Sequence, residues 1–313
     1  MRIIFCGTPE FAVPSLRALL QNSQFTVEAV LTQPDRPRGR GQKLSPSPVK
    51  EVAAEAGVRI YQPESMKSEG ARDLLVEVGP DAAVIIAYGQ IIPRRLLEIP
   101  RLGWMNLHAS LLPKYRGAAP IAWAIINGES KTGLTTMQLD PGLDTGPILL
   151  QRALEIGADE TTPQLAKRMS ELGAPLVAET LNRLERGAVL PQPQDPALAS
   201  YAPILTKEHG RVDWSQTAAE IYNRIRGLAP WPGAYTTFRG QLCHIGGRPC
   251  VPVAAGQPRE PGTLVIADRT VGVICGRGTR LQLESLQIEG RKRVSAREFV
   301  NGARLAGGER FGT

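Results

Sequence analysis

Residues 81–88, Asp-Ala-Ala-Val-Ile-Ile-Ala-Tyr, are the stretch that decides the fold. A short apolar run without alternation is typical of a strand buried on both faces of a parallel sheet. Similar runs predict strands at 2–6, 25–32 and 102–107, with helices from about residue 14 and at 48–57, 67–78 and 118–126. This alternation predicts an α/β fold with a doubly wound, mostly parallel sheet of Rossmann-like topology. Ligands of such sheets bind beyond the carboxyl ends of the strands.

The second half of the chain changes character. Leucines recur through 162–185 as in a long helix, and four prolines between 190 and 207 fit an extended linker. A helix at 215–226 is followed by short apolar runs, at 234–238, 242–245, 262–267, 271–274 and 281–288. Short strands with Gly-rich turns predict a small β-barrel. We therefore expect one domain over 1–189, a linker over 190–207 and a second domain over 208–313.

Two polar residues stand at the end of the strand predicted at 102–107. Asn106 and His108 are two positions apart, so their side chains point to the same face of a strand. A neutral amide and a titratable imidazole side by side can polarise a carbonyl and move a proton. The alternative for His108 taken alone is a hydrogen bond to a nearby backbone group.

A Gly/Pro-rich loop, Asp140-Pro-Gly-Leu-Asp144-Thr-Gly-Pro147, separates the apolar runs 133–139 and 148–156. A carboxylate in this loop can reach an imidazole on a neighbouring strand, fix its tautomer and stabilise its cation. Ordinary turn chemistry is the alternative for both aspartates. We favour a turn-forming role for Asp140 and a role in the functional site for Asp144, although spacing alone does not separate the two roles.

Composition excludes several classes of protein. The 313 residues suffice for two domains, and no apolar run reaches the ~20 residues of a membrane helix. The chain enters a strand directly without a signal peptide, so a cytoplasmic protein is expected. Its four cysteines match no common zinc pattern, so we expect free thiols and no metal. Gly7-Thr8-Pro9 is not a dinucleotide-binding loop, so no nicotinamide cofactor is indicated.

Positive charge is concentrated in two places. Residues 1–207 carry 22 Lys and Arg against 21 Asp and Glu, whereas residues 208–313 carry 15 against 9, a net of +6. Segment 34–50 holds five cations, Arg36, Arg38, Arg40, Lys43 and Lys50, against Asp35 alone. This pattern favours a polyanionic partner, with simple solubility as the alternative for the C-terminal excess.

Several motifs together resemble one family. These are Asn-x-His-x-Ser-Leu-Leu-Pro at 106–113 with Arg116-Gly117, Asp-x-Gly-x-Asp-Thr-Gly at 140–146, and segments 3–12, 32–37, 87–93 and 230–234. The chain is similar to the folate-dependent formyltransferases. The long basic loop and the extra C-terminal region select the members whose acceptor is a charged tRNA. The resemblance implies an OB-like C-terminal barrel, and a monomer that moves the formyl group of 10-formyltetrahydrofolate to the α-amine of methionyl initiator tRNA.

The resemblance also implies roles for individual residues. Asn106 would polarise the formyl oxygen, His108 would shuttle the proton and Asp144 would orient His108. The folate pocket would include Ser110, Leu111, Leu112, Pro113, Tyr88, Gly89 and Asp140, and the tRNA contacts would include Arg36, Arg38, Arg40, Lys43 and Lys207. Two alternatives remain: a formyltransferase for a sugar nucleotide or glycinamide ribonucleotide, and an RNA-binding module with an inactive folate site.

Overall fold

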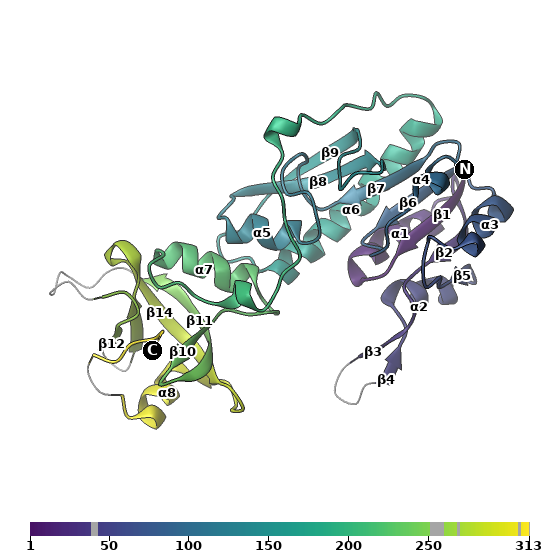
Figure 1. Cartoon of the computed structure of the whole chain (residues 1–313). Coiled ribbons are helices and arrows are strands. Elements are labelled where there is room, and N and C mark those ends of the chain that lie inside the picture. Colours follow the sequence, from purple (N-terminus) through teal and green to yellow (C-terminus); the bar gives the residue numbers. More distant parts are fainter. Residues whose placement is uncertain (39–42, 251–259, 268–269, 306–307, 313) are drawn as a thin grey trace. The chain divides into compact units, whose positions relative to one another are not determined.

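The computed structural model describes residues 1–38, 43–250, 260–267, 270–305 and 308–312 (Figure 1). The chain divides into two compact units. The first comprises 1–120, 131–155 and 165–203, and the second comprises 121–130, 156–164 and 204–313. Two short stretches that precede residue 165 therefore group with the C-terminal residues.

A seven-stranded sheet organises the first unit, in the order β5-β2-β1-β6-β7-β8-β9. Its strands are β1 Arg2–Gly7, β2 Thr26–Leu31, β5 Arg59–Tyr61, β6 Ala82–Ile86, β7 Trp104–His108, β8 Lys131–Gln138 and β9 Ile148–Glu155. The first five strands of that order run parallel, whereas β8 and β9 are antiparallel to their neighbours. The predicted Rossmann-like, mostly parallel sheet is confirmed.

Helices lie between or after these strands, most of them at the predicted places. They are η1 Glu10–Ala12, α1 Val13–Gln21, α2 Pro48–Glu55, α3 Glu69–Val78, α4 Arg94–Leu97, α5 Pro120–Ile126 and α6 Thr162–Glu185. The short η1 and α4 were not predicted. The Ser47 hydroxyl accepts from the backbone N–H of Lys50 and begins α2, with Pro48 in its first turn. Gly79, at φ 55°, ends α3 in the left-handed region that a residue with a Cβ adopts at a cost.

The core of the first unit forms around β6, whose five residues are all buried. One apolar cluster joins this strand to β1, α3 and α4 and includes Ile4, Leu75, Leu96 and Trp104. The indole N–H of Trp104 donates to the carbonyl of Leu96 at 2.8 Å, so the large ring is buried without an unsatisfied donor. This core fixes the amino end of β7, the strand that carries Asn106 and His108.

An antiparallel sheet organises the second unit, in the order β10-β11-β14-β13-β12, with β15 paired to β14. Its elements are η3 Glu208–Gly210, α7 Ala218–Gly227, β10 Tyr235–Phe238, β11 Gln241–Cys250, β12 Leu264–Ala267, β13 Thr270–Ile274, η4 Gly276–Gly278, β14 Arg280–Ile288, β15 Val294–Ser295 and α8 Ala296–Ala303. The short η2 Pro196–Leu198 precedes them and belongs to the first unit. Among the described strands β10 and β12 do not pair, so this unit is an antiparallel β domain without a closed ring of strands.

The helix predicted from Ser215 begins later than expected. Thr217 is the N-cap of α7 and forms a reciprocal capping box with Glu220. Ser215 instead donates its hydroxyl to the carboxylate of Asp213 at 2.7 Å. The serine therefore belongs to the turn before the helix.

All four cysteines are free thiols, as expected. Cys6, Cys243 and Cys275 are buried, whereas Cys250 at the end of β11 is half-buried. Burial raises the pKa of the Cys243 thiol to about 11 and that of Cys275 to about 12. In the described part of the chain, no helix has both the length and the apolar character needed to cross a membrane.

Candidate active site

Strand β7 places Asn106 and His108 on one face of the sheet. Leu107, between them, points to the other face and packs against Gly173 of α6. The contact is so close that a Cβ on Gly173 would lie 2.7 Å from the Leu107 side chain. Asn106 is half-buried, and its amide makes no hydrogen bond with any residue that the structure describes. An amide held by a rigid strand and left unpaired is suited to a substrate oxygen.

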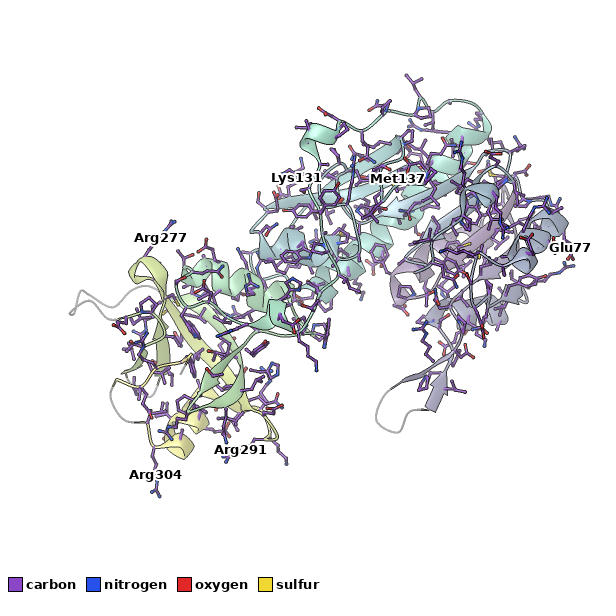
Figure 2. The ribbon with its side chains drawn as sticks, viewed as in Figure 1. Glu77, Lys131, Met137, Arg277, Arg291 and Arg304 are labelled. Carbon is purple, nitrogen blue, oxygen red and sulfur yellow. The ribbon has the colours of Figure 1, made fainter. Side chains whose placement is uncertain are left out.

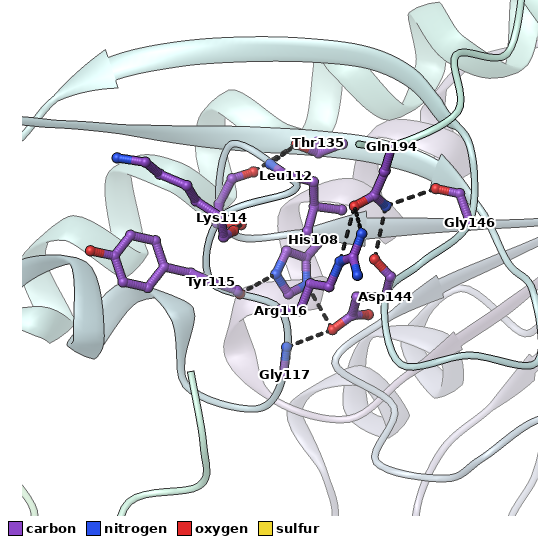
Figure 3. Close-up of polar contacts among 11 residues, drawn as sticks. His108, Leu112, Lys114, Tyr115, Arg116, Gly117, Thr135, Asp144, Gly146 and Gln194 are labelled. Atoms are coloured by element: carbon purple, nitrogen blue, oxygen red, sulfur yellow. Dashed lines mark hydrogen bonds and ion pairs between the residues drawn. The ribbon is translucent and has the colours of Figure 1, made fainter. Parts of the chain in front are cut away.

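His108 is held through both ring nitrogens (Figure 3). Its side chain is 6% exposed, Nε2 lies 2.9 Å from the carbonyl oxygen of Tyr115, and Nδ1 lies 3.6 Å from Oδ2 of Asp144. A carbonyl oxygen only accepts, so Nε2 carries a proton. Nδ1 is therefore the ring nitrogen that can act as a base, and it faces the carboxylate of Asp144.

Asp144 reaches His108 by a route that strand order alone does not suggest. Strand β8 is antiparallel to β7, so its last residue, Gln138, pairs with Met105 near the amino end of β7. The loop that follows has to fold back along β7 to bring Asp144 to the imidazole. Gly146 permits this fold, because a Cβ there would lie 1.7 Å from the carbonyl oxygen of Gln138.

The carboxylate of Asp144 is oriented by the backbone. The N–H of Gly117 donates to Oδ2 at 2.7 Å, and Asp144 itself has φ 51°, in the left-handed region. Gly117 has φ 116°, and a Cβ at this position would approach the carbonyl oxygen of Ala202 to 2.8 Å. The Arg116-Gly117 pair thus requires a glycine, since only that residue lets the backbone approach both Asp144 and Ala202.

The residues predicted to line a folate pocket fall into two groups. Ser110 is fully buried and donates to the carbonyl of Lys114 at 2.6 Å, which closes the turn that contains Leu112 and Pro113. Leu111 lies against Gly133 of β8. These residues build the wall beside β7, and their contact with folate stays a prediction.

The second group lies around the Asp140 loop and the end of β6. Asp140 accepts from the hydroxyl of Thr145 at 2.8 Å and from the N–H of Gly142 at 3.0 Å, as in ordinary turn chemistry. The ring of Tyr88 belongs to the core, with 1% exposed, and burial raises the pKa of its phenol. Of the pair Tyr88 and Gly89, only the backbone of Tyr88 and the exposed Gly89 can therefore face a ligand.

A cavity of about 510 Å³ opens at the carboxyl ends of β1, β2 and β6, the point where the strand order of the sheet reverses. Thr8, Gln33, Arg36, Ser47 and the stretch 87–89 line it. The carbonyl of Tyr88 accepts from the Thr8 hydroxyl at 3.1 Å and from the Gln33 amide at 3.2 Å, which ties the three strand ends together.

The basic segment predicted to contact RNA folds as a hairpin. β3 Arg36–Arg38 pairs with β4 Lys43–Ser45, and the hairpin extends from the first unit (Figure 1). Arg36 is exposed at the cavity, whereas Lys50 forms an ion pair with Asp35 at 2.6 Å and lowers the pKa of that carboxyl. Arg40 lies outside the described residues. Lys207 is exposed and precedes η3.

Sequence reasoning missed three partners of the site. They are the carbonyl of Tyr115, the N–H of Gly117 and the side-chain amide of Gln194. The first two are backbone groups, and residue type does not reveal which backbone groups take part in a site. Arg116-Gly117 was nevertheless part of the sequence motif at 106–117. Within the described residues, no group of three or more His, Cys, Asp or Glu side chains is placed to hold a metal ion.

A mostly parallel sheet with an imidazole, a carboxylate and an amide at a strand end suits an acyl-transfer enzyme, and comparison with family models identifies the family. Residues 1–181 match the model for formyl transferase, and residues 204–304 match that for the formyl transferase C-terminal domain. The first match alone covers more than half of the chain, so the protein belongs to the formyl transferase family.

Individual relatives make the comparison more specific. The chain is 51% identical, over 312 residues that span 100% of it and 99% of the relative, to a protein of Solibacter usitatus named methionyl-tRNA formyltransferase. A relative in Geobacter metallireducens with the same name is 48% identical over 100% of this chain and 99% of its own.

A solved structure shares the fold at low sequence identity. WlaRD, described as a sugar 3N-formyl transferase, has a TM-score of 0.65 at 19% identity over 93% of this chain and 99% of its own. At such identity the similarity shows the fold alone. It does not choose between acceptors.

Proposed function

We propose that this enzyme transfers the formyl group of 10-formyltetrahydrofolate to the α-amine of methionine esterified to initiator tRNA. The placement of His108 between a backbone carbonyl and the Asp144 carboxylate, two residues from an unpaired Asn106 amide, carries this proposal. The tRNA acceptor is supported by full-length similarity to relatives of that name and by the basic second unit. We further propose that the enzyme works as a monomer in the cytoplasm.

The reaction needs an oxyanion donor and a proton carrier. When the amine attacks the formyl carbon, the formyl oxygen gains negative charge, and the Asn106 amide donates to it. Nδ1 of His108 takes the proton that the amine loses and returns it to the folate nitrogen as the bond to the formyl carbon breaks. Asp144 stabilises the imidazolium between these two transfers. Typical contributions are about 100- to 1,000-fold for the oxyanion donor and about 100- to 10,000-fold for the proton carrier.

For the tRNA we propose two contact regions. The hairpin bearing Arg36, Arg38, Arg40 and Lys43 approaches the acceptor end, next to the cavity that Arg36 lines. Lys207 and the second unit hold phosphates of the tRNA. The exposed cations of the second unit include Arg277, Arg291 and Arg304 (Figure 2). Charge of this kind binds RNA through phosphate contacts that weaken as salt rises.

A formylation assay tests the acceptor. Purified protein is given 10-formyltetrahydrofolate and, separately, methionyl initiator tRNA, glycinamide ribonucleotide or an amino-sugar nucleotide. We expect product with the tRNA alone, and His108→Ala should lower kcat by about 100- to 10,000-fold with unchanged tRNA affinity. Formylation of a small amine in preference to tRNA would refute the acceptor, and full turnover by His108→Ala would refute the catalytic assignment.

Salt titration of tRNA binding tests the hairpin. Arg36→Gln should reduce the slope of log affinity against log salt by about one, because one phosphate contact is lost. Lys50→Gln is the matched control, since Lys50 is already paired with Asp35, and it should leave the slope unchanged. Equal slopes for wild type and Arg36→Gln would remove Arg36 from the interface.

A further inference from the structure

Gln194 lies outside every helix and strand, yet its side-chain amide is fully used (Figure 3). Nε2 donates to the carbonyl oxygens of Asp144 and Gly146, each at 2.8 Å. Oε1 accepts from Nε and Nη2 of Arg116 at 3.1 and 2.8 Å. A carboxamide has two N–H donors and an oxygen with two lone pairs, so all of its hydrogen-bonding capacity is satisfied.

Only one orientation of this amide fits its surroundings. Turned over, its oxygen would face two carbonyl oxygens and its NH₂ group would face a guanidinium. The amide therefore fixes the backbone of Asp144, which adopts a left-handed φ of 51° that a residue other than glycine adopts at a cost. Gln194 binds the loop on both sides of Thr145 and so helps to hold this conformation.

The same amide is anchored to the segment that holds the imidazole. Arg116 is 5% exposed and stands between Tyr115, whose carbonyl lies at Nε2 of His108, and Gly117, whose N–H binds the Asp144 carboxylate. Its own backbone is fixed by hydrogen bonds with Ser200 and Ala202. Gln194 thus closes a ring of contacts that sets the carboxylate against Nδ1.

We infer that Gln194 is a positioning residue for formyl transfer, which acts by holding the Asp144 carboxylate at the imidazole of His108. This inference rests on the proposed catalytic role of Asp144. Loss of the amide leaves the carbonyls of Asp144 and Gly146 and the Arg116 guanidinium without these partners, and it frees the loop to move. Misplacement of a catalytic group by about 1 Å can cost about a hundredfold in rate.

Steady-state kinetics of three variants test the inference. Gln194→Ala should lower kcat by about tenfold to a hundredfold, while KM for tRNA and for 10-formyltetrahydrofolate stays within about threefold. Gln194→Glu keeps an acceptor for Arg116 but cannot donate to the two carbonyls, so it should be impaired to a similar degree. Gln192→Ala is the matched control, because Gln192 is exposed and pairs with Ile148 through its backbone alone. It should retain wild-type kcat.

A double-mutant cycle separates positioning from general destabilisation. In an Asp144→Ala background, Gln194→Ala should cause no further loss of kcat, because the group it positions is gone. Wild-type kcat in Gln194→Ala and Gln194→Glu, or losses that multiply with that of Asp144→Ala, would overturn the inference. Full activity of Asp144→Ala would instead overturn the catalytic proposal itself. Should Gln194→Ala not fold, Gln194→Glu carries the same comparison.

Discussion

Replacing Asp144 by Asn isolates the charge of the carboxylate. The same oxygen, Oδ2, accepts from Gly117 and faces Nδ1 of His108, so an amide oxygen can take its place without moving the loop. Both side chains are mostly buried, at 15% and 6% exposed. The variant therefore keeps the shape of the site and removes the interaction between carboxylate and imidazolium.

The magnitude follows from the separation of the two groups. Unit charges 3.6 Å apart attract by about 4.6 kcal/mol at an effective dielectric constant of about 20. The loss of kcat is then about 2,000-fold if the imidazole is fully charged in the transition state, and about 50-fold if it carries half a charge.

Single-turnover formylation of methionyl-tRNA measures this loss directly. Asp195→Asn serves as the control, since Asp195 only caps η2 through the N–H of Ala197, and an amide oxygen preserves that cap. A rate for Asp144→Asn within threefold of wild type, or an equal loss in Asp195→Asn, would refute the electrostatic reasoning.

Three further changes have clear expected outcomes. Gly146→Ala places a Cβ 1.7 Å from the Gln138 carbonyl, so the loop must shift and kcat should fall about a hundredfold; unchanged kcat in a folded variant would contradict this. Tyr88→Phe removes a buried hydroxyl that has no hydrogen-bond partner among the described residues, so the melting temperature should stay equal or rise with kcat unchanged. Burial, and then Arg293, lower the pKa of His244 below 6.5, partly offset by Glu289. Its contribution to stability is therefore full above about pH 6.5 and declines as the pH falls toward the folded-state pKa. His244→Gln should flatten the loss of unfolding free energy between about pH 7 and pH 5, and equal losses in denaturant titrations of both proteins would contradict the assignment.

The fold was predictable where burial and residue pattern coincide. The run at 82–86 is buried throughout, and the helix predicted at 48–57 does begin at Pro48, after the capping hydroxyl of Ser47. The short strand β5 and the hairpin β3–β4 were missed, because Arg36-Pro37-Arg38 has no apolar alternation and is defined by its pairing partner. Local pattern predicts elements with their own hydrophobic face and fails for those that depend on a neighbour.

The site was predictable only in part, for a similar reason. A period of two placed Asn106 and His108 on one face without further information. The position of Asp144 depends on the antiparallel direction of β8, which the residue composition of that strand does not reveal. Gln194 stands 50 positions from Asp144 in a Pro-rich stretch, so its role follows from tertiary contacts alone.

The unequal burial of the four thiols has a practical consequence. Cys6, Cys243 and Cys275 are shielded, so a maleimide dye should attach selectively at Cys250, on the antiparallel β domain, without any cysteine having to be replaced. A single fluorophore there would report by anisotropy whether RNA has docked, in the wild-type enzyme and in every variant described above.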